Sequence, residues 1–326
     1  MTRSSVPPPV TAVMDAASAW LPAKMAQVED RLAELSGHHG PALGKEAEAT
    51  LTAGGKRLRP MLVLMAAGDG AGERAIRAAT AVELVHMATL VHDDVLDGAP
   101  VRRGRPTVVA RSGRDRAVGV GDLLFSRAFA EIAVDGGEPE VTELSSASVA
   151  LALGELAQRR DAYDTSITEE RYLERCSLKT ARLFESACRV GRLASGAPGT
   201  EELASFGREI GLAFQLLDDV LDVTGPPERT GKARGTDLLD GTVTLPLILA
   251  RRRDPVLEAA ELRGLDQPAA EELCDRIAET GALDQVRGRA EQGIKRAKGL
   301  LGSTGLSNQE LQLLGMIADG VIERYS

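Results

Sequence analysis

The chain has 326 residues, of which 43% are hydrophobic and only 3% aromatic, and its formal net charge at pH 7 is -9. Nucleic acid is excluded as a general partner, because phosphate backbones are bound by an excess of Lys and Arg. A membrane span is excluded as well, because no apolar run approaches the roughly 18 to 20 residues that cross a bilayer.

The three cysteines, Cys176, Cys188 and Cys274, form no CxxC pair and have no metal-ligand spacing with a histidine. A sparse, odd count of this kind indicates buried thiols in a reducing compartment. The first residues, MTRSSVPPPV, lack the apolar centre of a signal peptide. We therefore expect a cytoplasmic protein, whose product could still be a lipid that is handed to a membrane.

Residues 1–10 contain three consecutive prolines, and we expect them to be disordered. From Thr11 onward, Ala, Leu, Glu and Arg dominate, and apolar residues recur at spacings of three and four, which predicts helices. Strand signals are scarce, and no linker rich in Ser, Gly and Pro divides the chain. The sequence therefore predicts an all-α fold of roughly a dozen helices. We expect residues 11–326 to form one domain.

The first candidate binding segment is GGKRLRP, from Gly54 to Pro60. It lacks the GxxxxGK[ST] frame of a phosphate loop, since Thr50 stands where the first glycine belongs. Its two glycines nonetheless allow a tight turn that presents Lys56 and Arg59 together.

The next segment, ELVHMATLVHDDVLD, ends in an Asp-x-x-x-Asp pair, Asp93 and Asp97. On a helix these two residues share a face, with Cβ atoms roughly 5 to 6 Å apart. His86 lies two turns earlier on the same face. Within a turn or two after the motif, VRRGRPT brings Arg102 and Arg103, whose forked donors match phosphate oxygens.

Further along, the helical segment SLKTARLF carries Lys179 and Thr180 among apolar residues. Gln215 stands three residues before a second acidic string, so that FQLLDDVLD repeats the DDVLD of residues 93–97 with Asp218 and Asp222 in the outer positions. A Lys, a hydroxyl and an amide that face one cavity could stabilise a developing cation or hold a leaving group. Lys232, in a Gly-containing segment, could close over a phosphate as part of a lid.

The duplicated motif favours a metal site over a solvated acidic face, because Leu, Val, Phe and Met surround both sets of acids. Two carboxylates about 6 Å apart repel by roughly 3 kcal/mol at an effective dielectric of about 20. Magnesium prefers oxygen and is usually held by one or two carboxylates together with waters and substrate phosphates. The sequence thus predicts a cavity with an acidic wall on each side and a metal-bridged diphosphate between them.

These segments, together with GDLLFSRAF, GELAQ and GKARGTDLLDGTVTLP, resemble the trans-polyprenyl diphosphate synthases, over roughly residues 40–325 and in the same order. The resemblance implies the isoprenoid synthase fold, an all-α bundle around a central cavity and usually a homodimer. It implies that isopentenyl diphosphate condenses with an allylic diphosphate. One departure is Thr242, which stands where this family frequently has a lysine, and it puts a second lid lysine in doubt.

The resemblance also implies roles for individual residues. Asp93 and Asp97 would hold two Mg²⁺ ions on the allylic diphosphate, and Asp218 with Asp222 a third. Arg102 would contact the allylic diphosphate. The residues that would hold isopentenyl diphosphate are Lys56, Arg59, His86 and Arg103. Those that would surround the allylic diphosphate and the nascent cation are Lys179, Thr180, Gln215 and Lys232.

Product length depends, by the same resemblance, on Ala88 and Thr89, where short-chain enzymes have large aromatic residues. Helical geometry places Thr89 about 40° from Asp93, and Ala88 about 140° away. Because both side chains are small here, we expect a tunnel that stays open past about twenty carbons and a product of roughly thirty to fifty.

Three alternatives remain open from the sequence. A farnesyl or geranylgeranyl diphosphate synthase would differ only in product length. A terpene cyclase also uses an Asp-rich motif, but its second metal motif usually contains Asn or Ser, and it has no need of GGKRLRP. A non-catalytic partner subunit of a heteromeric synthase typically lacks some of the motif aspartates, all of which are present here.

Overall fold

The computed structural model describes residues 8–37, 46, 50, 57–102, 104–135, 137–225 and 233–323. Within these ranges the chain is almost entirely helical, which confirms the predicted all-α fold. The described strands form a single antiparallel hairpin of β1 (Val101–Arg102) and β2 (Arg105–Pro106). None of the described helices combines the length and the apolar character of a membrane span.

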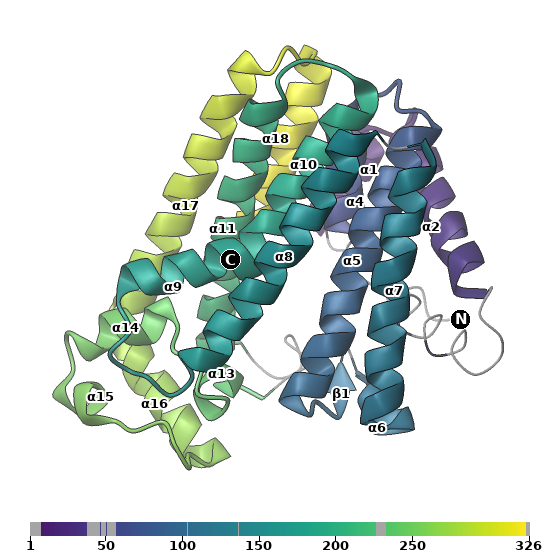
Figure 1. The fold of residues 1–326 in the computed structure, drawn as a ribbon. Coiled ribbons are helices and arrows are strands. Elements are labelled where there is room, and N and C mark those ends of the chain that lie inside the picture. Colours follow the sequence, from purple (N-terminus) through teal and green to yellow (C-terminus); the bar gives the residue numbers. More distant parts are fainter. Residues whose placement is uncertain are drawn as a thin grey trace.

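The N-terminal part consists of helices that pack along one side of the molecule (Figure 1). They are α1 (Pro8–Ala16), α2 (Leu21–Gly37) and α4 (Leu58–Ala67). Helix α1 begins inside the segment 1–10 that the sequence predicts to be disordered, so residues 8–10 are helical. Residues 1–7 lie outside the described part.

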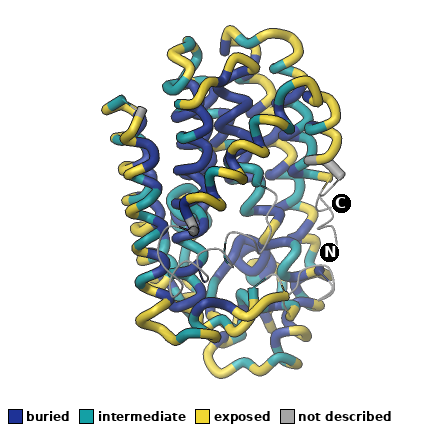
Figure 2. Tube along the Cα trace, turned by 90° about the vertical axis from the view of Figure 1, so that its right-hand side faces the viewer, coloured by how far each residue is buried: buried dark blue, intermediate teal, exposed yellow. Residues whose placement is uncertain are grey.

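Long helices form the body of the bundle and run alongside one another (Figure 1). They are α5 (Glu73–Asp97), α7 (Arg114–Asp135), α8 (Glu138–Arg160), α10 (Arg182–Ser195), α11 (Thr200–Thr224), α17 (Ala282–Leu300) and α18 (Asn308–Glu323). Helix α10 lies in the middle and packs against α4, α5, α8 and α11. Buried stretches of the chain run along the helices in the interior of the bundle (Figure 2). The largest fully buried side chains include Tyr172, Phe184 and Phe206.

Short elements connect the long helices. They are α6 (Val108–Ser112), α9 (Glu169–Cys176), α13 (Thr236–Leu239), α14 (Leu245–Arg251), α15 (Pro255–Ala259), α16 (Gln267–Glu279) and a 3₁₀ turn at Leu301–Ser303. The three cysteines are buried and form no disulfide with one another, as expected.

Between α9 and α10 the chain makes a π-helical turn, Ser177–Ala181, which carries Lys179 and Thr180. A π turn holds about one residue more than an α-helical turn and is frequently found at functional sites. Two neighbouring helices each contact this turn through a glycine. A Cβ atom on Gly154 of α8 would lie 2.6 Å from the backbone nitrogen of Lys179, and one on Gly211 of α11 would lie 2.6 Å from the Ala181 Cα atom. The absent side chains therefore let both neighbouring helices touch the turn.

Both aspartate motifs lie at the C-terminal ends of long helices. Helix α5 ends at Asp97, where Gly98 adopts a left-handed conformation (φ 61°), and α11 ends two residues after Asp222. A helix C-terminus carries a partial negative charge, which adds to the repulsion among these carboxylates and favours a bound cation.

Candidate functional site

A single cleft lies between the two motif-bearing helix ends, with a volume of about 1350 Å³ that includes its open mouth. It brings together residues from α4, α5, α8, α9, the π turn, α11 and α13. Ten of the residues predicted from the sequence line it: Arg59, His86, Thr89, Asp93, Asp97, Arg102, Lys179, Thr180, Gln215 and Asp218. The predicted residues Lys56, Arg103 and Lys232 lie outside the described part of the chain.

The first wall of the cleft is built on the last two turns of α5. Asp93 is half-buried there, and burial, opposed by Lys179 and Arg102, raises its pKa to about 6. Asp97 is more exposed and forms an ion pair with Arg159 of α8. A carboxylate whose charge is disfavoured by burial beside further acids is a site at which a cation stabilises the protein.

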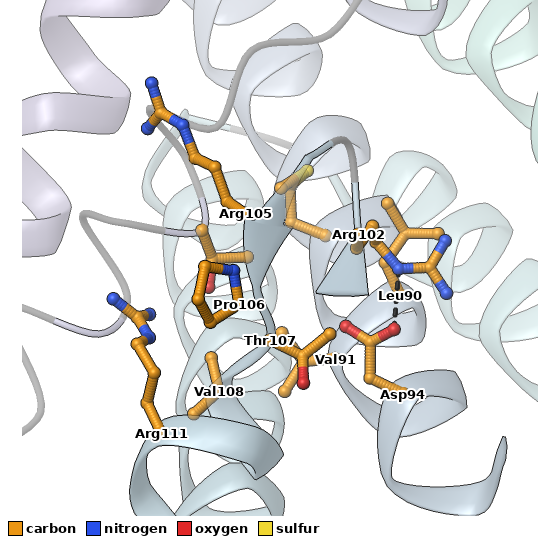
Figure 3. Close-up of a pocket in the computed structure, with 11 residues that line it drawn as sticks. Leu90, Val91, Asp94, Arg102, Arg105, Pro106, Thr107, Val108 and Arg111 are labelled. Carbon is orange, nitrogen blue, oxygen red and sulfur yellow. Dashed lines mark hydrogen bonds and ion pairs between the residues drawn. The ribbon is translucent and has the colours of Figure 1, made fainter. Parts of the chain in front are cut away.

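The middle aspartate of the first motif has a different role from its neighbours. Asp94 is 5% exposed and does not line the cleft, and its Oδ1 accepts a hydrogen bond of 2.7 Å from Nε of Arg102. Figure 3 shows this pair at the edge of a smaller pocket, with Arg105 and Arg111 on its far side. Asp94 thereby fixes the guanidinium of Arg102 on the rim of the cleft.

The second wall of the cleft is built on the end of α11, and there too an aspartate that lines the cleft is followed by a buried one. Asp218 is exposed to the cleft, whereas Asp219 is 3% exposed. Asp219 accepts hydrogen bonds from the Tyr172 hydroxyl at 2.5 Å and from Nε2 of Gln215 at 2.7 Å. Burial, with Asp237 nearby, raises the pKa of Asp219 to about 8, although these two hydrogen bonds act in the opposite direction.

Asp222, the last residue of the second motif, is not part of the cleft wall. Its Oδ2 accepts a hydrogen bond of 3.2 Å from the backbone N–H of Asp237, and its carbonyl accepts one of 3.0 Å from Gly235. Asp222 therefore anchors the segment that begins α13, which carries Asp237 and Asp240 into the cleft.

Between the walls, the π turn presents its two polar side chains. Nζ of Lys179 lies 2.5 Å from Oε2 of Glu155 on α8. Burial is the largest influence on Glu155 and opposes its ionisation, but the charges and hydrogen bonds of Lys179 and Arg159 together outweigh it, so the pKa of that carboxyl is lowered. The Thr180 hydroxyl donates to Oε1 of Gln215 at 2.6 Å. Hydrogen bonds from Thr180 and to Asp219 thus fix the amide of Gln215 in one orientation.

Arg59 and His86 meet on the side of the cleft next to α4. Nη1 of Arg59 lies 3.2 Å from Nε2 of His86, and the Arg59 guanidinium lies 4.4 Å from the centroid of the Phe184 ring. Because a guanidinium only donates, Nε2 of His86 is the acceptor in this contact. These two residues form a compact group that suits a second anionic ligand.

The two residues expected to control product length occupy different positions. Thr89 lines the cleft and its hydroxyl donates to the His86 carbonyl at 2.7 Å. Ala88 is fully buried and does not line the cleft. Leu90, Leu151, Leu183 and Phe214 form the apolar part of the wall.

The residues fit magnesium bound together with a phosphorylated ligand. In the described part of the chain, no three acidic, His or Cys groups converge closely enough to hold a metal by themselves. The carboxylates of both motif-bearing helix ends instead line one cleft, where their oxygens can act as donors to a metal. Magnesium usually takes one or two carboxylates and completes its octahedron with water and substrate phosphates, which is the donor set this cleft offers.

The metal-free protein should become more stable as the pH falls from 9 to about 5. Asp93 and Asp219 have folded-state pKa values of about 6 and 8, above the ordinary 3.8. Their protonation therefore stabilises the fold at low pH, and this stability is lost as the pH rises through those values. For Asp93 the loss amounts to about 3 kcal/mol.

Urea unfolding of the chelated protein across this pH range measures the effect. Asp219→Asn, which is neutral at every pH, should flatten the upper part of the profile. A free energy of unfolding that is constant or falls on acidification from pH 8 to 5.5 would contradict the prediction, since both carboxyls would then be ionised throughout.

Several residues in or next to the cleft are absent from the sequence-based prediction. Glu155 lies in the segment GELAQ, and Arg159 directly follows that segment. Nothing in the local sequence indicates that Glu155 pairs with Lys179 or that Arg159 pairs with Asp97. Asp94 and Asp219 do carry a signal, because each continues an apolar stripe of its helix and so falls on the buried face. Tyr172 and Arg175 of α9 also line the cleft.

The sequence model of the family described as "Polyprenyl synthetase" matches residues 41–279. The heptaprenyl diphosphate synthase component 2 of Geobacillus stearothermophilus is 39% identical over 85% of this chain and 88% of that protein. A geranylgeranyl diphosphate synthase of Methanosarcina mazei is 36% identical over 86% of this chain and 90% of its own length.

Among solved structures, a decaprenyl diphosphate synthase from Rhodobacter capsulatus superposes with a TM-score of 0.88 at 33% identity, covering 97% of this chain and 99% of that one. The match extends over the bundle and both aspartate-bearing helices. The chain belongs to the polyprenyl synthetase family.

Proposed function

We propose that the protein is a magnesium-dependent trans-prenyltransferase, which joins isopentenyl diphosphate to an allylic diphosphate. The observation that carries this proposal is the cleft itself, which Asp93 and Asp218 line from two different helix ends, together with Lys179, Thr180 and Gln215. A second anion site, Arg59 with His86, opens into the same cleft. Two diphosphates can therefore be held side by side.

In the proposed reaction the allylic C–O bond breaks, and the double bond of isopentenyl diphosphate attacks the resulting cation. Bound Mg²⁺ would neutralise charge that develops on the departing diphosphate. Lys179 and Arg102 add fixed positive charge at the same place, which is electrostatic stabilisation of the leaving group. The Oε1 atom of Gln215, oriented by Thr180, offers a partial negative charge to the cation. Elimination of a proton, taken up by the released diphosphate, completes the cycle.

The product is proposed to be longer than twenty carbons. Relatives with heptaprenyl and decaprenyl products support this assignment, and the small side chains of Ala88 and Thr89 agree with it. A geranylgeranyl diphosphate synthase at similar identity makes a twenty-carbon product the alternative.

The test is incubation of the purified chain with Mg²⁺, isopentenyl diphosphate and primers of ten, fifteen and twenty carbons, followed by mass analysis of the products. We expect prenyl diphosphates with added five-carbon units and release of pyrophosphate. Conversion of a primer to a hydrocarbon without consumption of isopentenyl diphosphate would identify a cyclase. Inactivity of the chain alone, relieved by a second subunit, would identify a component of a heteromer.

We propose further that the enzyme acts in the cytoplasm as a homodimer. The exposed face of α8 carries apolar side chains at helical spacing, Val149, Leu153 and Leu156, which are 52% to 66% exposed. A stripe of this kind suits a second copy of the same helix, related by a two-fold axis. The molar mass in solution tests this, since a monomer that is fully active would contradict it.

Replacing His86 should separate the two substrates. If Arg59 and His86 bind isopentenyl diphosphate, His86→Ala should raise the KM for this substrate about tenfold or more, in line with the loss of a charge-assisted contact, and change the KM of the primer much less. Steady-state kinetics with each substrate varied in turn measures both constants. Lys179→Met is the matched comparison, because Lys179 is assigned to the allylic diphosphate. It should raise the KM for the primer more than the KM for isopentenyl diphosphate. Equal or reversed effects for His86→Ala would mean that the two pockets are assigned backwards.

A further inference from the structure

Arg175 is a buried cation that the reaction outlined above leaves unused. It lies on α9, is 3% exposed, and lines the cleft on the side of the second aspartate motif. Its Nη2 donates to the Val243 carbonyl at 2.5 Å, and its guanidinium lies 5.6 Å from the centroid of the Tyr172 ring. Its Nη1 is buried and has no hydrogen-bond partner among the described residues.

A side chain in this state is costly to the fold. A buried guanidinium with an unpaired donor carries a desolvation penalty. Replacing such a buried charge by an apolar residue of similar volume often leaves the free energy of unfolding unchanged or raises it. The backbone carbonyl of Val243 holds the fork in place but supplies no counter-charge. The arrangement is therefore explained better by an anionic ligand that completes the fork than by a contribution to stability.

The segment around Thr242, which lies next to Arg175, has no cationic side chain at position 242. Thr242, which lines the same cleft, is neutral and stands where the resemblance described above would place a lysine. The segment is firmly held, because Thr242 N donates to the Asp237 carbonyl at 2.7 Å and Gly241 accepts from Tyr163 N at 2.7 Å. The acidic side chains of Asp218, Asp237 and Asp240 surround this position in the cleft. Arg175 brings positive charge to the place where residue 242 has none.

We propose that Arg175 binds the metal-bound diphosphate beside the second aspartate motif, and that it replaces the cation absent at position 242. Its planar fork is suited to phosphate oxygens, with Nη2 positioned by Val243 and Nη1 left as the donor without a protein partner among the described residues. Arg175 is thus a substrate-binding residue of the allylic diphosphate or of the released pyrophosphate. The inference rests on the proposed prenyltransferase function.

The experiment compares Arg175→Met with the parent enzyme by calorimetric titration with inorganic pyrophosphate in the presence of Mg²⁺, and by thermal melting without ligand. Loss of a charge-assisted contact should weaken pyrophosphate binding about tenfold to a hundredfold. The melting temperature should stay the same or rise, because a buried charge is removed. Arg171→Met is the matched control. Arg171 lies one turn earlier on α9, pairs with Asp161 and does not line the cleft, so pyrophosphate binding should be unchanged.

A second variant tests the replacement directly. Thr242→Lys should restore most of the pyrophosphate affinity that Arg175→Met has lost, because its ammonium enters the same cleft. Unchanged binding by Arg175→Met in an otherwise active enzyme would overturn the inference. So would a loss of binding that comes with a lower melting temperature and is not restored by Thr242→Lys, since that result identifies a structural role. If the parent enzyme neither binds pyrophosphate with Mg²⁺ nor elongates a primer, the proposed function itself fails.

Discussion

Asp93→Asn and Asp218→Asn should each lower kcat by about a thousandfold or more, because losing about 4 kcal/mol of electrostatic stabilisation in the transition state corresponds to that factor. Each substitution keeps the shape of the side chain and removes one oxygen charge from a facing wall of the cleft. Chelation of the parent enzyme should abolish turnover, and added Mg²⁺ should restore it. Steady-state rates and calorimetric Mg²⁺ titrations in the presence of pyrophosphate measure the two effects.

Melting temperatures separate this loss from unfolding. Because burial disfavours the charge of Asp93, the metal-free Asp93→Asn protein should be at least as stable at pH 8 as the parent. Asp284→Asn is the matched control, since its side chain is 85% exposed on α17 and pairs only with Arg287 among the contacts described for it. That variant should retain full activity. Undiminished turnover in excess EDTA would rule out the metal-dependent mechanism.

Thr89→Phe should shorten the product from more than twenty carbons to about fifteen or twenty, because an aromatic ring on the cleft wall blocks the path of the growing chain. Of the two residues predicted to control product length, Thr89 is the better one to replace, since it lines the cleft directly. The first condensation takes place at the aspartate motifs, one turn away, and should proceed at nearly the parental rate. Mass analysis of the products from a fifteen-carbon primer measures the distribution.

Two further variants sharpen the test. Thr89→Val keeps the volume and removes the hydroxyl, so its product should match that of the parent. Ala88→Phe should also shorten the product, but Ala88 is fully buried, and overpacking there should destabilise the protein by about 1 to 3 kcal/mol. If the parent enzyme already stops at about fifteen carbons, the floor of the pocket is formed by other residues and Thr89→Phe will not move it.

The features that the sequence predicts well are those encoded by helical spacing. Asp93 and Asp97 lie one turn apart on a helix, so the pattern alone places both on one face, and both line the cleft. The same spacing predicts that Asp218 and Asp222 share a face. Only Asp218 reaches the cleft, because Asp222 accepts hydrogen bonds from the backbone N–H groups of Gly235 and Asp237. Helical spacing carries no signal for these contacts, since both donors lie outside α11.

The features that the sequence leaves undetermined depend on contacts between distant segments. Arg159 and Asp97 are separated by 62 positions, and Tyr172 and Asp219 by 47. Each pair forms only because α8 and α9 are placed beside the motif-bearing helices. Arg175 could not be recognised for a related reason, since a lone arginine in an amphipathic helix normally points to solvent. Only its burial beside Thr242 distinguishes it.

The π-helical turn at Ser177–Ala181 is equivalent to one residue inserted into an otherwise continuous helix from α9 to α10. Removing one residue there would convert the turn to regular α-helix. Since each residue advances an α-helix by about 100°, everything on one side of the deletion would rotate by that angle against the other. Lys179 and Thr180 could then not face the cleft while Phe184 remained in the core. The length of this segment is therefore as tightly constrained as its composition.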